Sequence, residues 1–290
     1  MAKERFFKFI VKENCQLFDF LSSKLKDSSR NKIKSFLKHE QISVNGIKQK
    51  QYNHLLSKDD VVEIDFNKQE IFFHPKIKIL YEDDSIIVVD KASGIPTNPV
   101  MKDKDNSVFK VVLRYLRNKG HKNSLYYIHR LDKETSGALV FAKNPEAQDY
   151  LKENWHSNDH KRIYFAVVEG EVIPEKGTLT SWLKEDAKTQ KMFSSNYDNG
   201  GQKAITKFQV EKRSKNKTLL KIELITGRKN QIRIQLVEFG HPVVGDIKYG
   251  NKNKSEKRLF LHAFDLTIRH PETKKLMTFE VPLPNSFRKL

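Results

Sequence analysis

The chain lacks the features of secreted and membrane-spanning proteins. Cys15 is the only cysteine among 290 residues, so no disulfide can form within the chain. No stretch of about 18 apolar residues occurs, and the sequence therefore predicts no membrane-spanning helix. A signal peptide is not expected either, because charged side chains interrupt the N-terminus: Lys3, Glu4, Arg5, Lys8, Lys12 and Glu13. Together these absences predict a cytoplasmic protein.

Acidic residues are scarce relative to basic ones. The chain carries 54 lysines and arginines against 36 aspartates and glutamates, which gives a formal net charge of +18. Such a surplus attracts a polyanion and releases its counterions on binding, so nucleic acid is the first partner to consider. The alternative is a lysine-rich surface that is simply solvated. With 38% hydrophobic residues, the chain has enough apolar material for one large domain or two smaller ones.

The N-terminal segment has the pattern of two helices that share a basic face. Apolar residues recur at helical spacing over 17–25 and 33–37, and Ser28 or Ser29 can cap the second helix. Between residues 24 and 38 only Asp27 is acidic, which is too one-sided for salt bridging along a helix. The candidates for nucleic-acid contact there are Lys24, Lys26, Arg30, Lys32, Lys34 and Lys38.

A hairpin and a strand complete this module. Asn45-Gly46 supplies the positive φ angles of a type I′ turn, and Val61–Ile64 is predicted to be the closing strand. The order SSRNKIKSFLK, ISVNG and DDVVEI resembles the small RNA-binding domain called the alpha-L motif, which holds structured RNA by its phosphates. The resemblance implies a small α/β domain at 1–74, with its core at about 15–66 and a linker from Phe66. A helix pair whose lysines are only solvated is the alternative.

From residue 75 to 290 the pattern changes to many strands and few helices. IKILYEDDSIIVVDK predicts two strands around an acidic turn, 106–116 predicts an amphipathic helix, and Asn144-Pro145 starts another. Further strands are predicted at RIYFAVVEG, KAITKFQV, TLLKIELITG, RLFLHAFDLTI and LMTFEVPL. Because many strands follow one another directly, we predict an α+β domain with a mixed, largely antiparallel sheet.

One short stretch, Ile128–Gly137 (IHRLDKETSG), concentrates ionisable side chains between two apolar runs. An aspartate after a strand is often only a turn residue or a helix cap, and Asp132 with Glu134 fits that alternative. A glycosidase pair is not predicted, because the two carboxylates are only two residues apart. His156 and His160 lack the further ligands of a metal-binding helix, so no metal site is predicted.

HRLDKETSG resembles the HRLD-x-x-T-S-G motif of the RNA pseudouridine synthases of the RluA/RluD branch. The same family is indicated by further blocks in the same order: ILYEDDSIIVVDKASGIPTNP, RIYFAVVEG, GRKNQIRIQLVEFGHPVVGDIKYG and RLFLHAFDLTIRHP. The resemblance covers almost the whole chain and implies a pseudouridine synthase fold at 75–290. It also implies a reaction without a cofactor, in which the C1′–N1 bond of a uridine breaks and the base turns and rejoins through C5.

The resemblance implies roles for individual side chains. Asp132 matches the catalytic aspartate, Arg233 the basic residue that pairs with it, and Tyr164 the tyrosine that lies against the base. An ionised carboxylate in a desolvated site needs a nearby cation, which agrees with this pairing; direct attack on C1′ and a glycal route both stay open. Arg130 matches the arginine that fills the gap left by the flipped nucleotide. The rest of the motif is interpreted as structural: His129, Thr135, Ser136 and Gly137.

Among the positions that depart from the family pattern, four replace a histidine or a lysine. Family members usually read GRTHQIRVH where this chain reads GRKNQIRIQ, so Asn230 and Gln235 replace two histidines. Arg162 stands where lysine is common, and Asn98 where histidine is frequent. Amides can keep hydrogen bonds but cannot carry a proton charge. We expect none of the four to contact the three catalytic side chains.

Two functions of different classes fit these features. The first is an RNA pseudouridine synthase, with ribosomal RNA favoured as the target and transfer RNA as the alternative. The second is a non-catalytic RNA-binding protein that acts in ribosome assembly or RNA folding. Retention of the carboxylate, the tyrosine and the arginine favours the enzyme, because an unused ion pair in a desolvated site costs stability. A monomer is the simplest expectation, since the predicted site needs no residue from a second chain.

Overall fold

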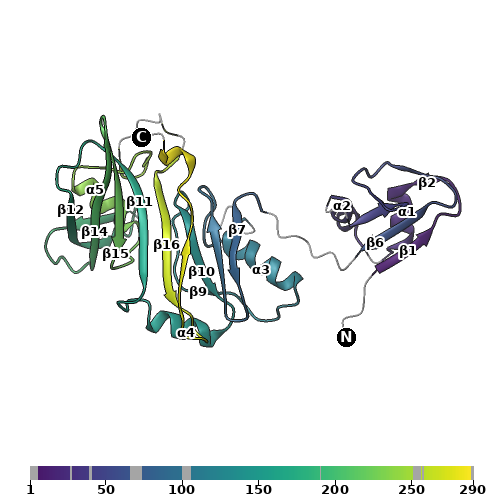
Figure 1. Ribbon diagram of the computed structural model, residues 1–290, viewed down its shortest axis with the longest axis horizontal. Helices are drawn as coiled ribbons and strands as arrows, with labels where there is room; N and C mark the ends of the chain where they lie inside the picture. Colours follow the sequence, from purple (N-terminus) through teal and green to yellow (C-terminus); the bar gives the residue numbers. More distant parts are fainter. Residues whose placement is uncertain are drawn as a thin grey trace. The chain divides into compact units, whose positions relative to one another are not determined.

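The chain folds into two compact units (Figure 1). The computed structural model describes residues 6–26, 28–38, 41–65, 74–99, 106–189, 191–250, 256 and 258–288. The boundary between the units lies between Phe73 and His74, and Tyr115–His121 groups with the first unit. Most of the predicted linker, residues 66–73, lies outside the described residues. Each unit has a hydrophobic core of its own.

The first unit combines a four-stranded antiparallel sheet with two helices. The strand order is β1-β6-β3-β4. Its elements are β1 (Phe6–Ile10), β2 (Cys15–Gln16), α1 (Leu17–Lys24), α2 (Arg30–Lys38), β3 (Ile42–Val44), β4 (Ile47–Lys48), β5 (Leu55–Leu56) and β6 (Val61–Asp65). The sheet begins before the predicted core at about residue 15, because β1 pairs with β6. FFKFI does not alternate regularly between apolar and polar residues, which conceals this strand in the sequence.

The helices, hairpin and closing strand predicted for this unit are present. Asn45 and Gly46 have φ angles of 50° and 79°, as a type I′ turn requires. The Lys32 amide donates to Ser29 Oγ at the start of α2, so this serine caps the helix. The apolar faces of α1 and α2 are buried in the unit's core: Leu17, Phe20, Leu21, Ile33, Phe36 and Leu37.

The second unit is built on one 11-stranded sheet. The main strand order is β13-β12-β14-β15-β11-β16-β10-β8-β7, with β17 paired to β16 and β9 to β10. The elements after residue 74 are β7 (Ile77–Glu82), β8 (Ile86–Lys91), α3 (Val108–Asn118), β9 (Tyr126–Tyr127), β10 (Ser136–Ala142), α4 (Pro145–Glu153), β11 (Lys161–Glu169), β12 (Lys176–Glu185), β13 (Met192–Ser195), β14 (Gln202–Ser214), β15 (Lys217–Leu224), α5 (Gln231–Glu238), β16 (Leu261–Arg269), β17 (Leu276–Glu280) and η1 (Asn285–Arg288).

The predicted fold class is confirmed. In the described part of this sheet, β10 and β16 pair parallel and the other strand pairs are antiparallel. The predicted helix start at Asn144 is also present, since its side chain accepts from the Ala147 amide and Pro145 follows. The sequence did not predict β12, β13 or α5. Helix α5 lacks the periodicity of an amphipathic helix, because Gln231–Leu236 are all buried and their polar and apolar residues alternate as in a strand.

The junction between β10 and β16 requires glycine at position 137. Gly137 has a φ of +119°, and a Cβ there would overlap the Ala263 carbonyl oxygen and lie 2.6 Å from its carbon. This is backbone of the paired strand, which cannot move aside as a flexible side chain could. We expect Gly137→Ala to lower the free energy of unfolding by about 3 kcal/mol or more, measured by urea denaturation.

Gly200 is a matched control for this substitution. It also has a positive φ, +76°, but no atom lies within 4 Å of the position of its missing Cβ. Gly200→Ala should therefore cost only the backbone strain, about 1 kcal/mol. Equal losses in the two variants would contradict the close approach of β10 and β16 as the cause.

Candidate active site

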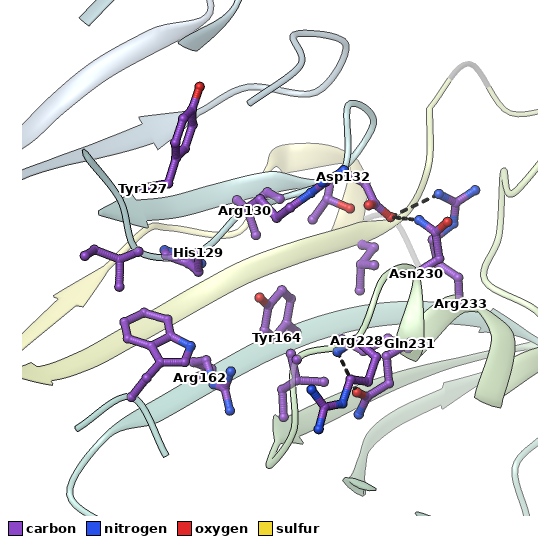
Figure 2. A pocket seen from close by; sticks show the side chains of 18 of the residues that line it. Tyr127, His129, Arg130, Asp132, Arg162, Tyr164, Arg228, Asn230, Gln231 and Arg233 are labelled. Atoms are coloured by element: carbon purple, nitrogen blue, oxygen red, sulfur yellow. Dashed lines mark hydrogen bonds and ion pairs between the residues drawn. The ribbon is translucent and has the colours of Figure 1, made fainter. Parts of the chain in front are cut away.

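A cavity of about 340 Å³ lies in the second unit, between the loop before β10, strand β11 and the start of α5 (Figure 2). Its lining includes the three side chains predicted as catalytic, Asp132, Tyr164 and Arg233. Arg130 and His129 line it as well. The volume falls within the range of about 300–1,000 Å³ that is typical of small-molecule sites. The fold therefore gathers at one cavity residues that are far apart in the sequence.

The loop that carries Asp132 is held by the end of β8 and by the segment that follows this strand. Thr97 brackets Leu131, because its hydroxyl donates to the Leu131 carbonyl at 2.7 Å and accepts from the Leu131 amide at 3.1 Å. Lys91 is fully buried, and its ammonium group donates to three backbone carbonyls, those of Ala92, Ile95 and Lys133. Asp132 belongs to neither a helix nor a strand, but these contacts fix the backbone on both sides of it.

Arg233 lies between two carboxylates. Its Nη1 is 3.1 Å from Oδ2 of Asp132, and its Nε and Nη2 are each 2.7 Å from an oxygen of Asp246. Asp246 is fully buried, whereas 22% of the Asp132 side chain is exposed. Burial acts to lower the pKa of Arg233, but the bonds and charges of Asp246 and Asp132 outweigh it and raise the pKa. The two-point contact with Asp246 orients the guanidinium and leaves one N–H group for Asp132.

Asn230 is a second donor to Asp132. Its Nδ2 donates to Oδ2, the oxygen that Arg233 also contacts. Our expectation that none of the four departures contacts a catalytic side chain is therefore wrong, because the turn before α5 brings residue 230 against the loop before β10. Gln235 lies elsewhere on α5 and holds the helix to β12 and β14 through Leu179, Ser181, Ala204 and Thr206.

Strand β11 contributes Tyr164 and Arg162, which are two positions apart and so share a face. A register shift between Ile163 and Tyr164 interrupts the pairing of β11 with β16, and such bulges re-aim side chains. Burial raises the pKa of Tyr164 to about 12, and the negative charge of Asp132 adds to the rise. The phenol is therefore neutral at physiological pH.

Arg162 is a buried cation that has no carboxylate partner among the described residues. It is 8% exposed, its Nη2 donates to the Ile225 carbonyl at 2.6 Å, and its Cζ lies 5.6 Å from the centre of the Trp155 ring. Burial lowers its pKa. Arg130 and Arg228 also line the cavity, so the wall around the carboxylate is mainly basic. This charge suits an anionic ligand.

The basic candidates of the first unit lie on its surface. Their described side chains are exposed: Lys24, Lys26, Arg30, Lys32 and Lys34. Lys38 ends α2, and its side chain lies outside the described residues. Lys34 Nζ is 5.9 Å from the centre of the Tyr52 ring, and Tyr52 as a residue is 57% exposed. Exposed cations beside an aromatic ring offer both charge and a stacking surface to a nucleic acid.

Comparison with known proteins decides the family. The model of the RNA pseudouridylate synthase family matches residues 85–238, a range that includes Asp132, Tyr164, Asn230 and Arg233. The uncharacterized RNA pseudouridine synthase YhcT of Bacillus subtilis (strain 168) is 33% identical, over 94% of this chain and 91% of its own. The chain belongs to the RNA pseudouridylate synthase family. The predicted family and the predicted class of enzyme, an isomerase that acts on RNA, are thereby confirmed.

Two further comparisons extend this result. The synthase is 30% identical to ribosomal large subunit pseudouridine synthase D of Neisseria meningitidis serogroup B (strain MC58), over 91% of this chain and 75% of that protein. Among solved structures, human RNA pseudouridylate synthase domain containing 4 matches with a TM-score of 0.58 and 25% identity, over 72% of this chain and 90% of that one. The large sheet of the second unit is accordingly a pseudouridine synthase fold.

The two histidines that follow α4, His156 and His160, have different surroundings. His156 lines the cavity, whereas His160 Nε2 accepts from the Arg269 amide at 2.9 Å. Within the described ranges, no group of three His, Cys, Asp or Glu side chains is placed to hold a metal ion. None of the helices described is long and apolar enough to cross a membrane.

Thr135 and Ser136 of the HRLDKETSG motif hold its backbone in place through hydrogen bonds. The Thr135 amide donates to the Asp132 carbonyl and closes a turn, so Asp132 does not cap a helix. Ser136 Oγ lies 2.8 Å from His262 Nδ1 and accepts from Arg258. Because His262 Nε2 faces the Val281 carbonyl and must carry the proton, Nδ1 accepts from Ser136. These contacts agree with the structural interpretation of the motif.

His129 is held in the synthase as a neutral imidazole. Its Nε2 accepts from the Val140 amide at 3.1 Å, and its ring centre lies 4.9 Å from that of Trp155. Burial lowers the pKa of His129 to about 3, and the charge of Arg162 adds to this effect. In the unfolded chain the ring titrates near pH 6.5. Its contribution to stability is therefore complete above about pH 6.5 and is lost as the pH falls toward 3.

Protonation of His129 should make the protein less stable in acid. We expect acidification from pH 7 to pH 5 to lower the free energy of unfolding by up to about 2 kcal/mol through His129. His129→Gln keeps an acceptor for the Val140 amide but does not titrate, so it should lose less stability over the same interval. Urea unfolding of both proteins at both pH values measures the difference. Equal losses would assign the acid sensitivity to other groups.

The sequence did not indicate that several further residues support the site. Asp246, which orients Arg233, lies within the third matching block but had no role assigned to it. Lys91 lies on a strand of apolar pattern, where a lysine is normally exposed, and Thr97 follows it in a loop. Only an inventory of charged residues inside apolar runs would have pointed to Lys91. The contact of Asn230 with Asp132 spans 98 residues and depends on the fold.

Proposed function

We propose that the synthase isomerises specific uridines in large structured RNA, ribosomal RNA first, and that Asp132 is its catalytic residue. The observation that carries this proposal is a carboxylate at a basic, partly aromatic cavity, held through one oxygen by Arg233. Tyr164 lies on the same wall as Arg162 and is proposed to contact the base. Similarity to a protein named ribosomal large subunit pseudouridine synthase D supports ribosomal RNA as the target.

The chemistry asks little of the protein beyond a carboxylate and positioning. The C1′–N1 bond breaks, the detached base turns, C5 bonds to C1′, the C5 hydrogen leaves as a proton and N1 gains one. No electron is gained or lost overall. Asp132 assists the first step either by attack on C1′ or by removal of a proton from the sugar, and both roles need the ionised form. Arg233 Nη1 donates to Asp132 Oδ2 at 3.1 Å, so the carboxylate faces a positive charge in the folded site.

Access to the glycosidic bond requires the nucleotide to leave the helix stack. Arg130 is exposed, lines the cavity and lies two residues before Asp132, so it is placed to fill the space that the flipped nucleotide leaves. The neutral phenol of Tyr164 then provides a face against the uracil ring. Arg162 and Arg228 supply charge for the phosphates on either side of that nucleotide.

We further propose that residues 1–74 form an RNA-binding domain and residues 75–290 the catalytic domain. The exposed basic face of α1 and α2 supports this division, because phosphate contacts from lysines add affinity that does not depend on sequence. The predicted roles of Lys24, Lys26, Arg30, Lys32, Lys34 and Lys38 belong to this proposal. We also propose a monomer, because the three proposed catalytic side chains meet within one copy of the chain.

Neutralising two of these lysines tests the domain. We expect Lys32→Gln with Lys34→Gln to weaken binding to ribosomal RNA, and to reduce the slope of log affinity against log salt by up to about 2. Filter binding at several salt concentrations measures both quantities. The matched control is Lys207→Gln with Lys221→Gln, two exposed lysines on strands of the second unit that do not line the cavity. An unchanged slope for the Lys32→Gln, Lys34→Gln variant would mean that these two lysines do not contact RNA.

Release of tritium from RNA labelled at uridine C5 tests the proposed reaction and its target. The purified chain is incubated with ribosomal RNA and, separately, with transfer RNA. We expect release from ribosomal RNA at a fixed, small number of sites and none from transfer RNA. Release from transfer RNA alone would overturn the proposed target. Release from neither RNA would contradict the proposed reaction and favour a non-catalytic RNA-binding protein.

A further inference from the structure

The helix that follows Asn230 explains neither the backbone conformation of this residue nor the contact that its side chain makes. It occupies the position before α5 with φ 56° and ψ 21°, in the left-handed region that asparagine tolerates better than most residues. An asparagine at this position often caps its helix with its side chain. The Asn230 side chain makes no such bond and contacts Asp132 instead.

The orientation of the Asn230 amide is fixed by its neighbours. Its Oδ1 accepts from Tyr249 hydroxyl at 3.0 Å and from Lys248 Nζ at 3.4 Å. An ammonium group can only donate, and a carboxylate can only accept. The oxygen must therefore face Lys248 and the NH₂ group must face Asp132. The opposite orientation would place two acceptors against each other and two donors against each other.

Both donors to Asp132 contact the same oxygen. Arg233 Nη1 and Asn230 Nδ2 each bond Oδ2. Among the described residues, no group donates to Oδ1. Two donors on one oxygen fix the rotation of a carboxylate that a single ion pair would leave free to turn. The unbonded oxygen is then the one available to a ligand in the cavity.

We propose that Asn230 is a positioning residue that presents Oδ1 of Asp132 to the substrate, and that it does so without a group that titrates near neutral pH. The inference rests on the proposed role of Asp132. An imidazole at this position would change its charge and its donors with pH. An amide oriented by a hydroxyl keeps the same donor throughout.

The surroundings of Asn230 agree with this independence from pH. The titratable and charged groups that face it or flank it are Asp132 on the loop before β10, Arg233 on α5, Lys248 and Tyr249 after Asp246, and Arg228 and Lys229 on its own segment. No histidine is among them. The pH response of an imidazole introduced at position 230 will therefore stand out against the wild-type background.

Three variants of the full chain test the proposal, assayed by tritium release from ribosomal RNA between pH 5.5 and 8.5. We expect Asn230→Ala to lower kcat about 10- to 100-fold with KM nearly unchanged, since small errors in the geometry of reacting groups cost that much. Asn230→His should restore most of kcat at one end of the range only, with a sigmoidal dependence on pH that wild type lacks. Tyr249→Phe frees the amide to turn and should lower kcat in the same direction as Asn230→Ala, but less.

Asn216→Ala is the matched control, because Asn216 has a similar left-handed φ of 64° and lies in the exposed turn between β14 and β15. It should lower thermal stability as Asn230→Ala does and leave kcat unchanged. Unchanged kcat in Asn230→Ala and Tyr249→Phe, or a pH profile of Asn230→His identical to wild type, would overturn the inference. A wrong proposed role for Asp132 would give a different result. In that case Asp132→Asn would release tritium as fast as wild type.

Discussion

Asp132→Asn should reduce tritium release from ribosomal RNA by about 10⁴-fold or more, which is the order of loss when the central group of an active site is removed. Asparagine has the same shape and can still accept the bonds from Asn230 and Arg233 through its oxygen. It has no negative charge, and it can neither attack C1′ nor take a proton from the sugar. The loss should therefore appear in kcat, with RNA binding and thermal stability close to wild type.

Glu134→Gln is the control for this prediction. Glu134 lies in the same loop, also carries a carboxylate and does not line the cavity. Its neutralisation should leave the rate within a few fold of wild type. Full activity in Asp132→Asn would remove this residue from the mechanism, whereas equal losses in both variants would point to a general dependence on the charge of the loop.

Arg233→Lys should have the second largest effect, although the charge is kept. The guanidinium uses three N–H groups to reach Asp246 at two points and Asp132 at a third, and an ammonium group cannot span the same geometry. We expect kcat to fall about 100-fold, because Asp132 loses its paired cation. The free energy of unfolding should fall by about 3 kcal/mol, because the Asp246 side chain, 0% exposed, loses its two-point partner.

Arg269→Lys is the control that shows what an arginine-to-lysine replacement does outside the site. Arg269 is paired with Asp159, and both side chains are well exposed, at 38% and 54%. Arg269→Lys should change the stability by less than about 1 kcal/mol and leave kcat unchanged. If Arg233→Lys behaves like this control, the buried network of two aspartates and one arginine does not support the site.

The fold of the second unit was largely predictable because its strands have strong apolar patterns. β8, β10 and β11 are buried on both faces or nearly so, and their sequences are continuous apolar runs bounded by turn residues. Helix α5 could not be found in this way, because its residues 231–236 are all buried and alternate between polar and apolar, as in a strand. β1 was missed for a related reason, since FFKFI lacks regular alternation.

The site was only partly predictable from the sequence. Motif resemblance identified Asp132, Tyr164 and Arg233, and the fold places all three at one cavity. Beyond the pairing of Arg233 with Asp132, it gave no information on which groups orient them, because the contacts of Asp246 and Asn230 depend on the turns on either side of α5. The replacement of histidine by Asn230 was visible in the sequence, but its contact with the carboxylate was not.

Pseudouridine mapping of total RNA is the most direct test of this function. The RNA is taken from cells that carry the wild-type gene, a deletion, or Asp132→Asn as the only copy. We predict that one or more pseudouridines in large-subunit ribosomal RNA disappear in the deletion and in Asp132→Asn alike, and that the wild-type gene restores them. Sites that persist after the deletion, or that stay modified when Asp132→Asn is the only copy, would contradict an Asp132-dependent synthase of ribosomal RNA.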